Sequence, residues 1–183
     1  STSRRRRRIS RLSACARHCA ICRAQPVAWS HRSRRAIGLR VDRVLHDGDQ
    51  VKIGNVVLVA HLTPGHTKGC TTWTLKVADG GRSYDVVIIG SLGVNPGFQL
   101  VNNKEVPQMA DEYARAFKIS RTLPCDIPLG SHPGMYNLAE KYAKLEKGGP
   151  NPFIDPAGYK AELDLDEAMY RAVLDAQTKA AAR

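Results

Sequence analysis

The sequence predicts a layered α/β fold, in which helices pack on a sheet, for the chain beyond its first forty residues. Residues 41–90 contain short apolar runs joined by polar turns, which is the pattern of strands that follow one another along the chain. Apolar residues at helical spacing then predict three helices, at 106–123, 137–147 and 156–179. A run of strands followed by helices favours helix-on-sheet layers.

The strands are predicted in order from their composition. A short strand is expected at 41–45, before the Asp-Gly-Asp turn at 47–49, and residues 51–53 alternate as a half-buried strand does. Residues 56–60 are five consecutive apolar residues, which is the composition of a strand buried on both faces.

Further strands follow on either side of the first helix. Residues 70–77 alternate aromatic or aliphatic side chains with threonines, and a hairpin turn at 78–81 leads into a buried strand at 84–89. After the helix at 106–123, residues 127–129 predict a last short strand.

Each of the three predicted helices has an apolar stripe, which in the helix at 106–123 consists of Met109, Tyr113, Ala116, Phe117 and Ile119. In the helix at 137–147 the stripe consists of Leu138, Tyr142 and Leu145. In the helix at 156–179 it consists of Tyr159, Leu163, Ala168, Met169, Ala172 and Val173. We expect these stripes to pack against the sheet.

Two histidines directly follow predicted buried strands. His66 comes just after the turn residues Pro64-Gly65, and His132 comes just after the strand at 127–129. Loops held by rigid strands tend to carry binding groups, and a neutral imidazole is a good zinc ligand. The alternative for each histidine is a loop side chain bonded to the backbone.

Four short sequence motifs follow one another along the chain. They are TPGHTKGCTTW at 63–73, GSLGVNPGF at 90–98, CDIPLGSHPG at 125–134 and GPNPF at 149–153. Together they resemble segments of class B, subclass 3 of the metallo-β-lactamase superfamily. The resemblance runs from near Arg40 to the end of the chain.

The resemblance implies a zinc-dependent hydrolase that opens the β-lactam ring with a metal-bound hydroxide. It makes His66 the third histidine of the first of two zinc sites, and His132 the last histidine of the second. Ser91 and Asn95 match positions that meet the β-lactam carboxylate, although Gly93 replaces a serine that the subclass often has. The resemblance also implies a periplasmic or secreted protein. From the charge distribution and the lack of a long apolar run, we expect no specific nucleic-acid partner and no membrane partner.

The same resemblance implies that the fold is incomplete. The family fold is an αββα sandwich, and residues 41–183 supply only its C-terminal half. This sequence does not contain the motif H-x-H-x-D-H, which provides the remaining zinc ligands, so we expect weak zinc binding, no catalytic residue and little hydrolysis. We also expect an apolar sheet face to be left open, which favours self-association.

Other hydrolases of this fold, such as a lactonase or a thioesterase, are an alternative to a β-lactamase. The segment GSLGVNPG at 90–97 favours the β-lactamase.

The first forty residues differ from the rest in composition. They hold 12 of the 28 basic residues and no acidic one, which leaves 16 basic and 17 acidic side chains elsewhere and explains the net charge of +11. We interpret 1–40 as a disordered or out-of-frame segment before a partial metallo-β-lactamase domain at 41–183. No apolar segment long enough for a secretory signal follows the arginines, and no run approaches a membrane span.

Two other functions are considered for the arginine-rich segment. One is a non-catalytic basic protein that binds nucleic-acid phosphates through residues 4–40, although a block of like charges is more typical of a solvated tail. The other is a zinc site formed by Cys15, His18, Cys19, Cys22 and His31. No second pair of cysteines or histidines follows at zinc-site spacing, which weighs against it.

Overall fold

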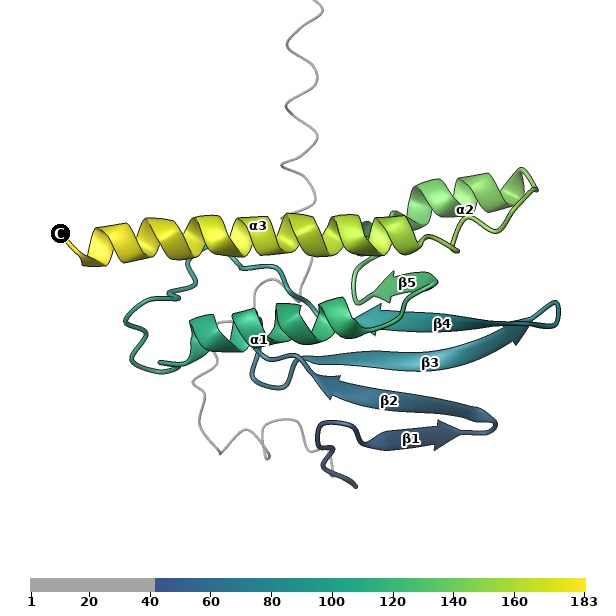
Figure 1. The fold of residues 1–183 in the computed structure, drawn as a ribbon, viewed down its shortest axis with the longest axis horizontal. Helices are drawn as coiled ribbons and strands as arrows, with labels where there is room; N and C mark the ends of the chain where they lie inside the picture. Colours follow the sequence, from purple (N-terminus) through teal and green to yellow (C-terminus); the bar gives the residue numbers. More distant parts are fainter. Residues whose placement is uncertain (1–41) are drawn as a thin grey trace, which may run out of the picture. The chain divides into compact units, whose positions relative to one another are not determined.

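Five strands form one sheet, in which neighbouring strands are also consecutive along the chain (Figure 1). The computed structural model describes residues 42–183. The strands are β1 (Gln50–Ile53), β2 (Val56–Leu62), β3 (Thr71–Asp79), β4 (Arg82–Ile89) and β5 (Ile127–Gly130). The first four pair antiparallel, and β5 pairs parallel to β4. Consequently β2, β4 and β5 run in the same direction, and their carboxyl ends lie at one edge of the sheet.

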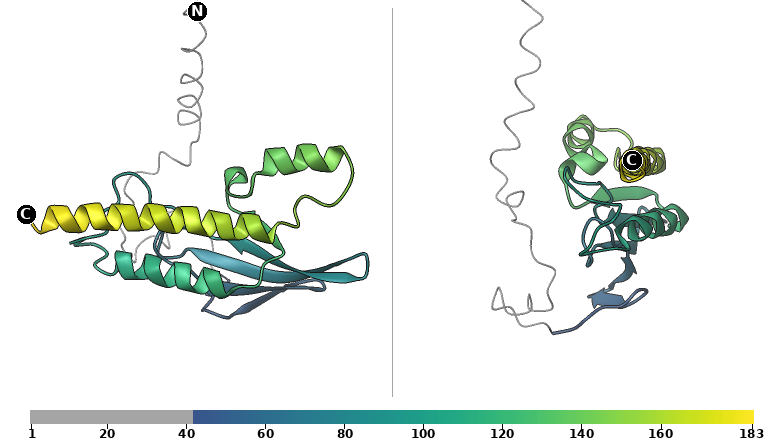
Figure 2. Two further views of the ribbon diagram at one scale, coloured as in Figure 1. Left: turned by 45° about the horizontal axis from the view of Figure 1, so that its top comes forward. Right: turned by 90° about the vertical axis from the view of Figure 1, so that its left-hand side faces the viewer.

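Three α-helices accompany the sheet, the first of them between β4 and β5 along the chain, and two of the three pack on the sheet. They are α1 (Met109–Thr122), α2 (Leu138–Glu146) and α3 (Pro156–Ala181), with a short 3₁₀ helix, η4 (Pro133–Tyr136), before α2. α1 and α3 contact each other and lie on the same side of the sheet (Figure 2). The layered α/β fold predicted from the sequence is therefore confirmed.

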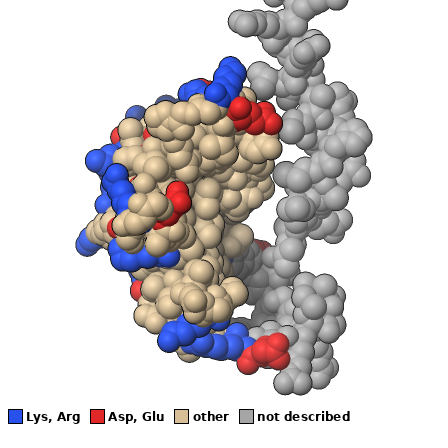
Figure 3. Space-filling view, turned by 90° about the vertical axis from the view of Figure 1, so that its right-hand side faces the viewer, with Lys and Arg blue, Asp and Glu red and all other residues tan. Residues whose placement is uncertain are grey.

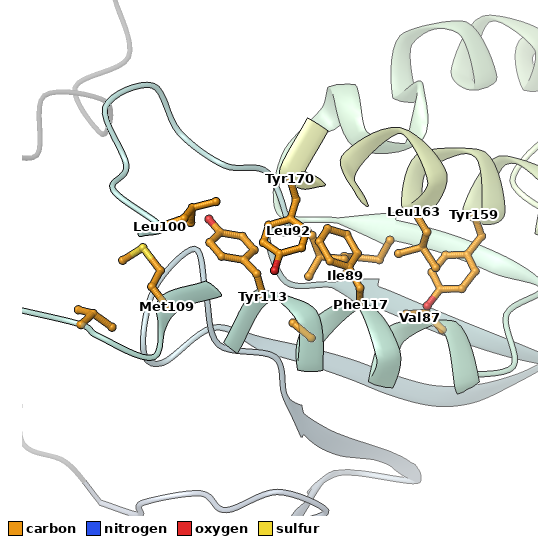
Figure 4. Close-up of a cluster of buried hydrophobic side chains, with 12 residues drawn as sticks. Val87, Ile89, Leu92, Leu100, Met109, Tyr113, Phe117, Tyr159, Leu163 and Tyr170 are labelled. Carbon is orange, nitrogen blue, oxygen red and sulfur yellow. The ribbon is translucent and has the colours of Figure 1, made fainter. Parts of the chain in front are cut away.

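The hydrophobic core lies between β4 and the helices α1 and α3 (Figure 4). It includes Val87 and Ile89 from β4, Tyr113 and Phe117 from α1, and Tyr159, Leu163 and Tyr170 from α3. Val87 and Ile89 are two residues apart, so they point to the same face of the sheet. That face is the one that the helices cover.

The prediction of a strand at 41–45 is wrong for residues 42–45, which are the part of this range that the structure describes. Residues 42–49 form no strand, and Val44 is 56% exposed. Polar side chains hold this segment in an irregular conformation: Asp49 accepts from the backbone amide of His46 at 2.8 Å, and Asp47 accepts from that of Leu62 at 2.7 Å. The first strand, β1, therefore begins only at Gln50.

The prediction that residues 56–60 are buried on both faces is also wrong. Val56 is 37% exposed, and only Ala60 in this run is buried. The strand register explains the exposure of Val56, which lies on a face of the sheet that receives none of the helices' core side chains; Ala60 and Val86 lie on the same face and are buried. We call this face the open sheet face; it contains Ile53, Val56, Leu58, Ala60, Trp73, Leu75, Val86, Ile88, Ile127 and Leu129.

The apolar stripe of α3 is shifted from the predicted one. Tyr159 and Leu163 are buried as expected, but Tyr170 is buried whereas Met169 is 51% exposed. Positions 159, 163 and 170 follow helical periodicity, and position 169 lies about 100° away around the helix. In α2, Tyr142 and Leu145 are 55% and 44% exposed, so the predicted packing of that stripe is wrong as well.

The buried side of α2 instead carries a charge. Lys141 is 6% exposed, and its Nζ lies 2.9 Å from Oδ2 of Asp155, which also caps α3 by accepting from the amide of Gly158. The hydrogen bond from Lys141 lowers the pKa of Asp155 from its ordinary value of 3.8, although burial opposes this. The pair therefore ties α2 to the start of α3.

This pair predicts an acid-dependent part of the stability. Because the folded-state pKa of Asp155 is the lower one, its contribution is present above about pH 4 and is lost as pH falls through the folded-state pKa. In Asp155→Asn the cap is kept, but Lys141 loses its anion, and we expect a loss of about 1–3 kcal/mol at pH 7. Urea denaturation at pH values from 7 to 2 should show that the free energy of unfolding falls less steeply with acid in the variant than in the wild-type protein. Parallel profiles for the two proteins would contradict the role assigned to this pair.

Basic and acidic side chains are nearly balanced in number beyond the first forty residues. Residues 41–183 carry 16 basic and 17 acidic side chains. On the face drawn in Figure 3, Lys and Arg lie in separate groups with acidic residues among them. The arginine-rich residues 4–40, and the functions considered for them, lie outside the described residues. Within residues 42–183, no helix combines the length and apolar character needed to cross a membrane.

Candidate metal-ligand and substrate site at the sheet edge

Three loops that carry predicted site residues start at the same edge of the sheet. His66 lies in the loop after β2, Ser91 and Asn95 lie in the loop after β4, and His132 lies just after β5. Since β2, β4 and β5 run in the same direction, their carboxyl ends place all four residues at this edge.

The His66 side chain is oriented by a backbone oxygen. Its Nδ1 lies 2.8 Å from the carbonyl oxygen of Gly93, in the loop after β4. A carbonyl oxygen can only accept, so Nδ1 carries the hydrogen, and in the neutral ring Nε2 keeps its lone pair. Metal-binding histidines are commonly fixed in this way, through the nitrogen that does not bind the metal. The Phe98 ring lies beside it, with ring centroids 6.0 Å apart.

The loop around His66 is rigidly held. Thr63 and Thr72 are buried and share a hydroxyl–hydroxyl hydrogen bond of 3.0 Å, and the amide of Thr63 donates to the carbonyl of Cys70 at 2.9 Å. Gly65 has a φ of 138° and lies against the ring of Tyr113. These contacts set the position from which His66 extends.

The two predicted substrate-binding residues differ in exposure. Ser91 is half-buried, and its carbonyl accepts from the Cys70 thiol at 3.3 Å, which links the loops after β2 and β4. Asn95 is exposed, and its carbonyl accepts from the amide of Phe98 at 3.1 Å in a turn. The side chain of Asn95 is therefore accessible to a ligand at the edge.

His132 is exposed and directly precedes the 3₁₀ helix η4. Its carbonyl accepts from the amide of Met135 at 3.1 Å, and Met135 packs against the hydrophobic core. The core thus anchors the segment that carries His132 and leaves the imidazole outside it.

The sequence interpretation did not identify an acidic pair that α3 brings to this site. Burial raises the pKa of Asp166, and a protonated His66 would lower it. Oδ1 of Asp166 would lie 3.8 Å from a Cβ placed on Gly93, so this carboxyl lies beside the residue whose carbonyl binds His66. Burial also raises the pKa of Glu162, one helical turn earlier, and the charge of Asp166 adds to this. The sequence signal is that Asp166 falls between Leu163 and Tyr170 on the buried stripe.

A complete zinc donor set is not present in the described part of the chain. Among residues 42–183, no three His, Cys, Asp or Glu side chains come together in a way that could hold a metal ion. His66 by itself fits as one zinc ligand, because Nε2 is the unprotonated nitrogen, but catalytic zinc commonly has three protein ligands.

No protein-family model matches the chain, whereas several solved structures do. The FEZ-1 metallo-β-lactamase from Legionella gormanii is 51% identical, with a TM-score of 0.74 over 75% of this chain and 53% of that one. BJP-1, a subclass B3 metallo-β-lactamase of Bradyrhizobium japonicum, is 34% identical, with a TM-score of 0.71 over 78% and 53%.

A third structure is described by its metal content. The class B3 di-zinc metallo-β-lactamase LRA-12 from an Alaskan soil metagenome is 28% identical, with a TM-score of 0.67 over 73% of this chain and 51% of that one. This chain thus spans about half the length of the enzymes that it matches. The chain is therefore a relative of the class B3 metallo-β-lactamases in sequence and in fold, over about three quarters of its own length.

Proposed function

We propose that residues 41–183 form the part of a zinc-dependent β-lactam hydrolase that carries one histidine of each of two zinc sites, His66 and His132. The observation that carries this proposal is the orientation of His66, whose Nδ1–H is taken by the Gly93 carbonyl so that Nε2 is left to bind a metal. The identity to FEZ-1 and the placement of both histidines at one sheet edge support it.

In this proposal the loop after β4 recognises the substrate. Ser91 and Asn95 lie between the two histidine loops in the strand order, and their polar side chains suit the carboxylate of a β-lactam. Zinc, when bound, supplies an activated water. The described residues hold His66 in orientation and connect its loop to that of Ser91, and they do not complete a zinc site.

Zinc titration tests the metal assignment. We expect weak binding by this chain, reduced at least tenfold in affinity in His66→Ala and His132→Ala. His46→Ala is the matched control, because His46 has a side chain that is 82% exposed and lies before β1. Calorimetry with all four proteins measures the difference; tight binding of two zinc ions by the chain, or equal affinities in all variants, would refute the assignment.

A substrate screen separates the two hydrolase hypotheses. A full-length protein that contains this segment together with an H-x-H-x-D-H motif should hydrolyse a carbapenem. Asn95→Ala should raise KM more than it lowers kcat. The lost contact holds the substrate carboxylate in the bound substrate as well as in the transition state, so its removal weakens both alike. Hydrolysis of an acyl lactone without hydrolysis of the carbapenem would instead support the lactonase alternative.

We also propose that the chain self-associates through the open sheet face. The face is continuous across the five strands, and Ile53, on β1, is 66% exposed. Ile53→Lys should shift the protein towards the monomer in sedimentation velocity. Leu165→Lys, at a residue of α3 that is 58% exposed, is the control and should not. If Ile53→Lys leaves the association constant unchanged, the surface is assigned wrongly.

A further inference from the structure

The Gly93 carbonyl oxygen receives two hydrogen bonds. One comes from Nδ1 of His66 at 2.8 Å, and the other comes from the hydroxyl of Tyr113, on α1, at 3.1 Å. Since the carbonyl cannot donate, the phenol is the donor in the second bond, as the imidazole is in the first. One backbone oxygen thus connects the candidate ligand to a residue of the core.

Tyr113 is itself held firmly. It is 0% exposed, and its ring stacks on that of Tyr170 from α3, with centroids 5.5 Å apart and planes 23° apart (Figure 4). Gly65, next to His66 in sequence, also lies against this ring. Tyr113 therefore contacts both the loop that carries His66 and the loop that carries the acceptor of His66.

The Gly93 peptide needs such support. Residues 90–95 form no regular structure, so the strand ladder does not fix the direction of this carbonyl. Gly93 also has no side chain that would restrict rotation of its peptide planes. A second donor from a buried and stacked ring sets the direction in which the oxygen points.

We propose that Tyr113 is a positioning residue for His66: its hydroxyl fixes the Gly93 carbonyl, and the carbonyl in turn keeps the hydrogen of His66 on Nδ1 and presents Nε2. The value of this arrangement for metal binding rests on the function proposed above. The arrangement itself is a property of the folded chain and is measurable without metal.

The imidazole tautomer is the readout. Long-range proton–nitrogen NMR on the full chain with ¹⁵N-labelled histidine, at about pH 9 where histidine is neutral, distinguishes the two ring forms. We expect His66 to be in the Nδ1–H form in the wild-type protein. If His66 is found in the Nε2–H form, the proposal is overturned by the wild-type spectrum alone, whatever the variants do.

Removal of the hydroxyl tests the role of Tyr113. In Tyr113→Phe we expect the ratio of Nδ1–H to Nε2–H forms of His66 to fall about threefold to tenfold, the range that one lost hydrogen bond allows. Tyr170→Phe is the matched control, because it also removes a hydroxyl group from the same ring stack. That hydroxyl donates to the Ala110 carbonyl at 2.9 Å and not to Gly93. It should leave the His66 ratio unchanged.

Two further outcomes complete the test. An equal change in both variants would mean that the ring stack acts through general packing, and it would overturn the specific role of Tyr113. Zinc added to the same samples tests the proposed function separately. If the Tyr113→Phe ratio changes as expected but zinc perturbs no His66 resonance, the positioning role stands and the metal assignment fails.

Discussion

Gly65→Ala is expected to destabilise the protein by about 3–5 kcal/mol, because it combines backbone strain with a clash in the core. Gly65 has a φ of 138°, which residues with a side chain rarely adopt, and a Cβ there would lie 2.8 Å from Cγ of Tyr113. Tyr113 is fully buried and stacked on Tyr170, so its ring cannot move aside without disturbing α1 and α3. Urea denaturation monitored by tryptophan fluorescence measures the loss.

Gly48→Ala separates the two causes. Gly48 also has a positive φ, of 82°, but nothing lies within 4 Å of a Cβ placed there. This variant carries the backbone strain alone, for which we expect about 1–2 kcal/mol. Similar losses for both variants would show that the contact of Gly65 with Tyr113 is relieved at little cost, and that this contact does not hold the His66 loop.

Leu163→Ala should have an effect of similar size for a different reason. Leu163 is 2% exposed and belongs to the core between β4, α1 and α3. Truncation of a buried leucine removes apolar contacts and leaves a cavity, which costs about 2–5 kcal/mol. Denaturant midpoints, compared at an unchanged slope, measure the change in the free energy of unfolding.

Leu165→Ala provides the control on the same helix. Leu165 is 58% exposed, so its truncation removes few contacts, and we expect a change within about 0.5 kcal/mol. Both substitutions place alanine in α3 and alter helix propensity alike. If the two variants lose the same stability, the core does not depend on α3 in the way the structure indicates.

The sequence predicted most elements because their signals are local. The run of strands from residue 51 to 89, the helix that became α1 and the strand after it all appear close to their expected bounds. Each depends on periodicity and turn residues within a dozen positions. The strand expected at 41–45 does not form in the described residues. The side chains of Asp47 and Asp49 accept hydrogen bonds from backbone amides, and these bonds compete with the backbone hydrogen bonds between paired strands.

Local sequence signals did not determine which side chains of α3 are buried. Met169 and Tyr170 are adjacent, both are large and partly apolar, and helical periodicity alone allows either to join Leu163. The structure selects Tyr170, whose ring stacks on Tyr113 and whose hydroxyl reaches the Ala110 carbonyl. That choice depends on residues about 60 positions away.

By itself the sequence determined the layered fold, the relationship to class B3 metallo-β-lactamases, and two histidines placed just past strand ends. Those conclusions follow from patterns within single segments. Only the tertiary structure decided that β2, β4 and β5 share a direction, that the Gly93 carbonyl binds the His66 ring, and that Tyr113 supports both. The physical reason is that hydrogen bonds and ring contacts between distant segments depend on strand pairing and helix packing, which no local pattern encodes.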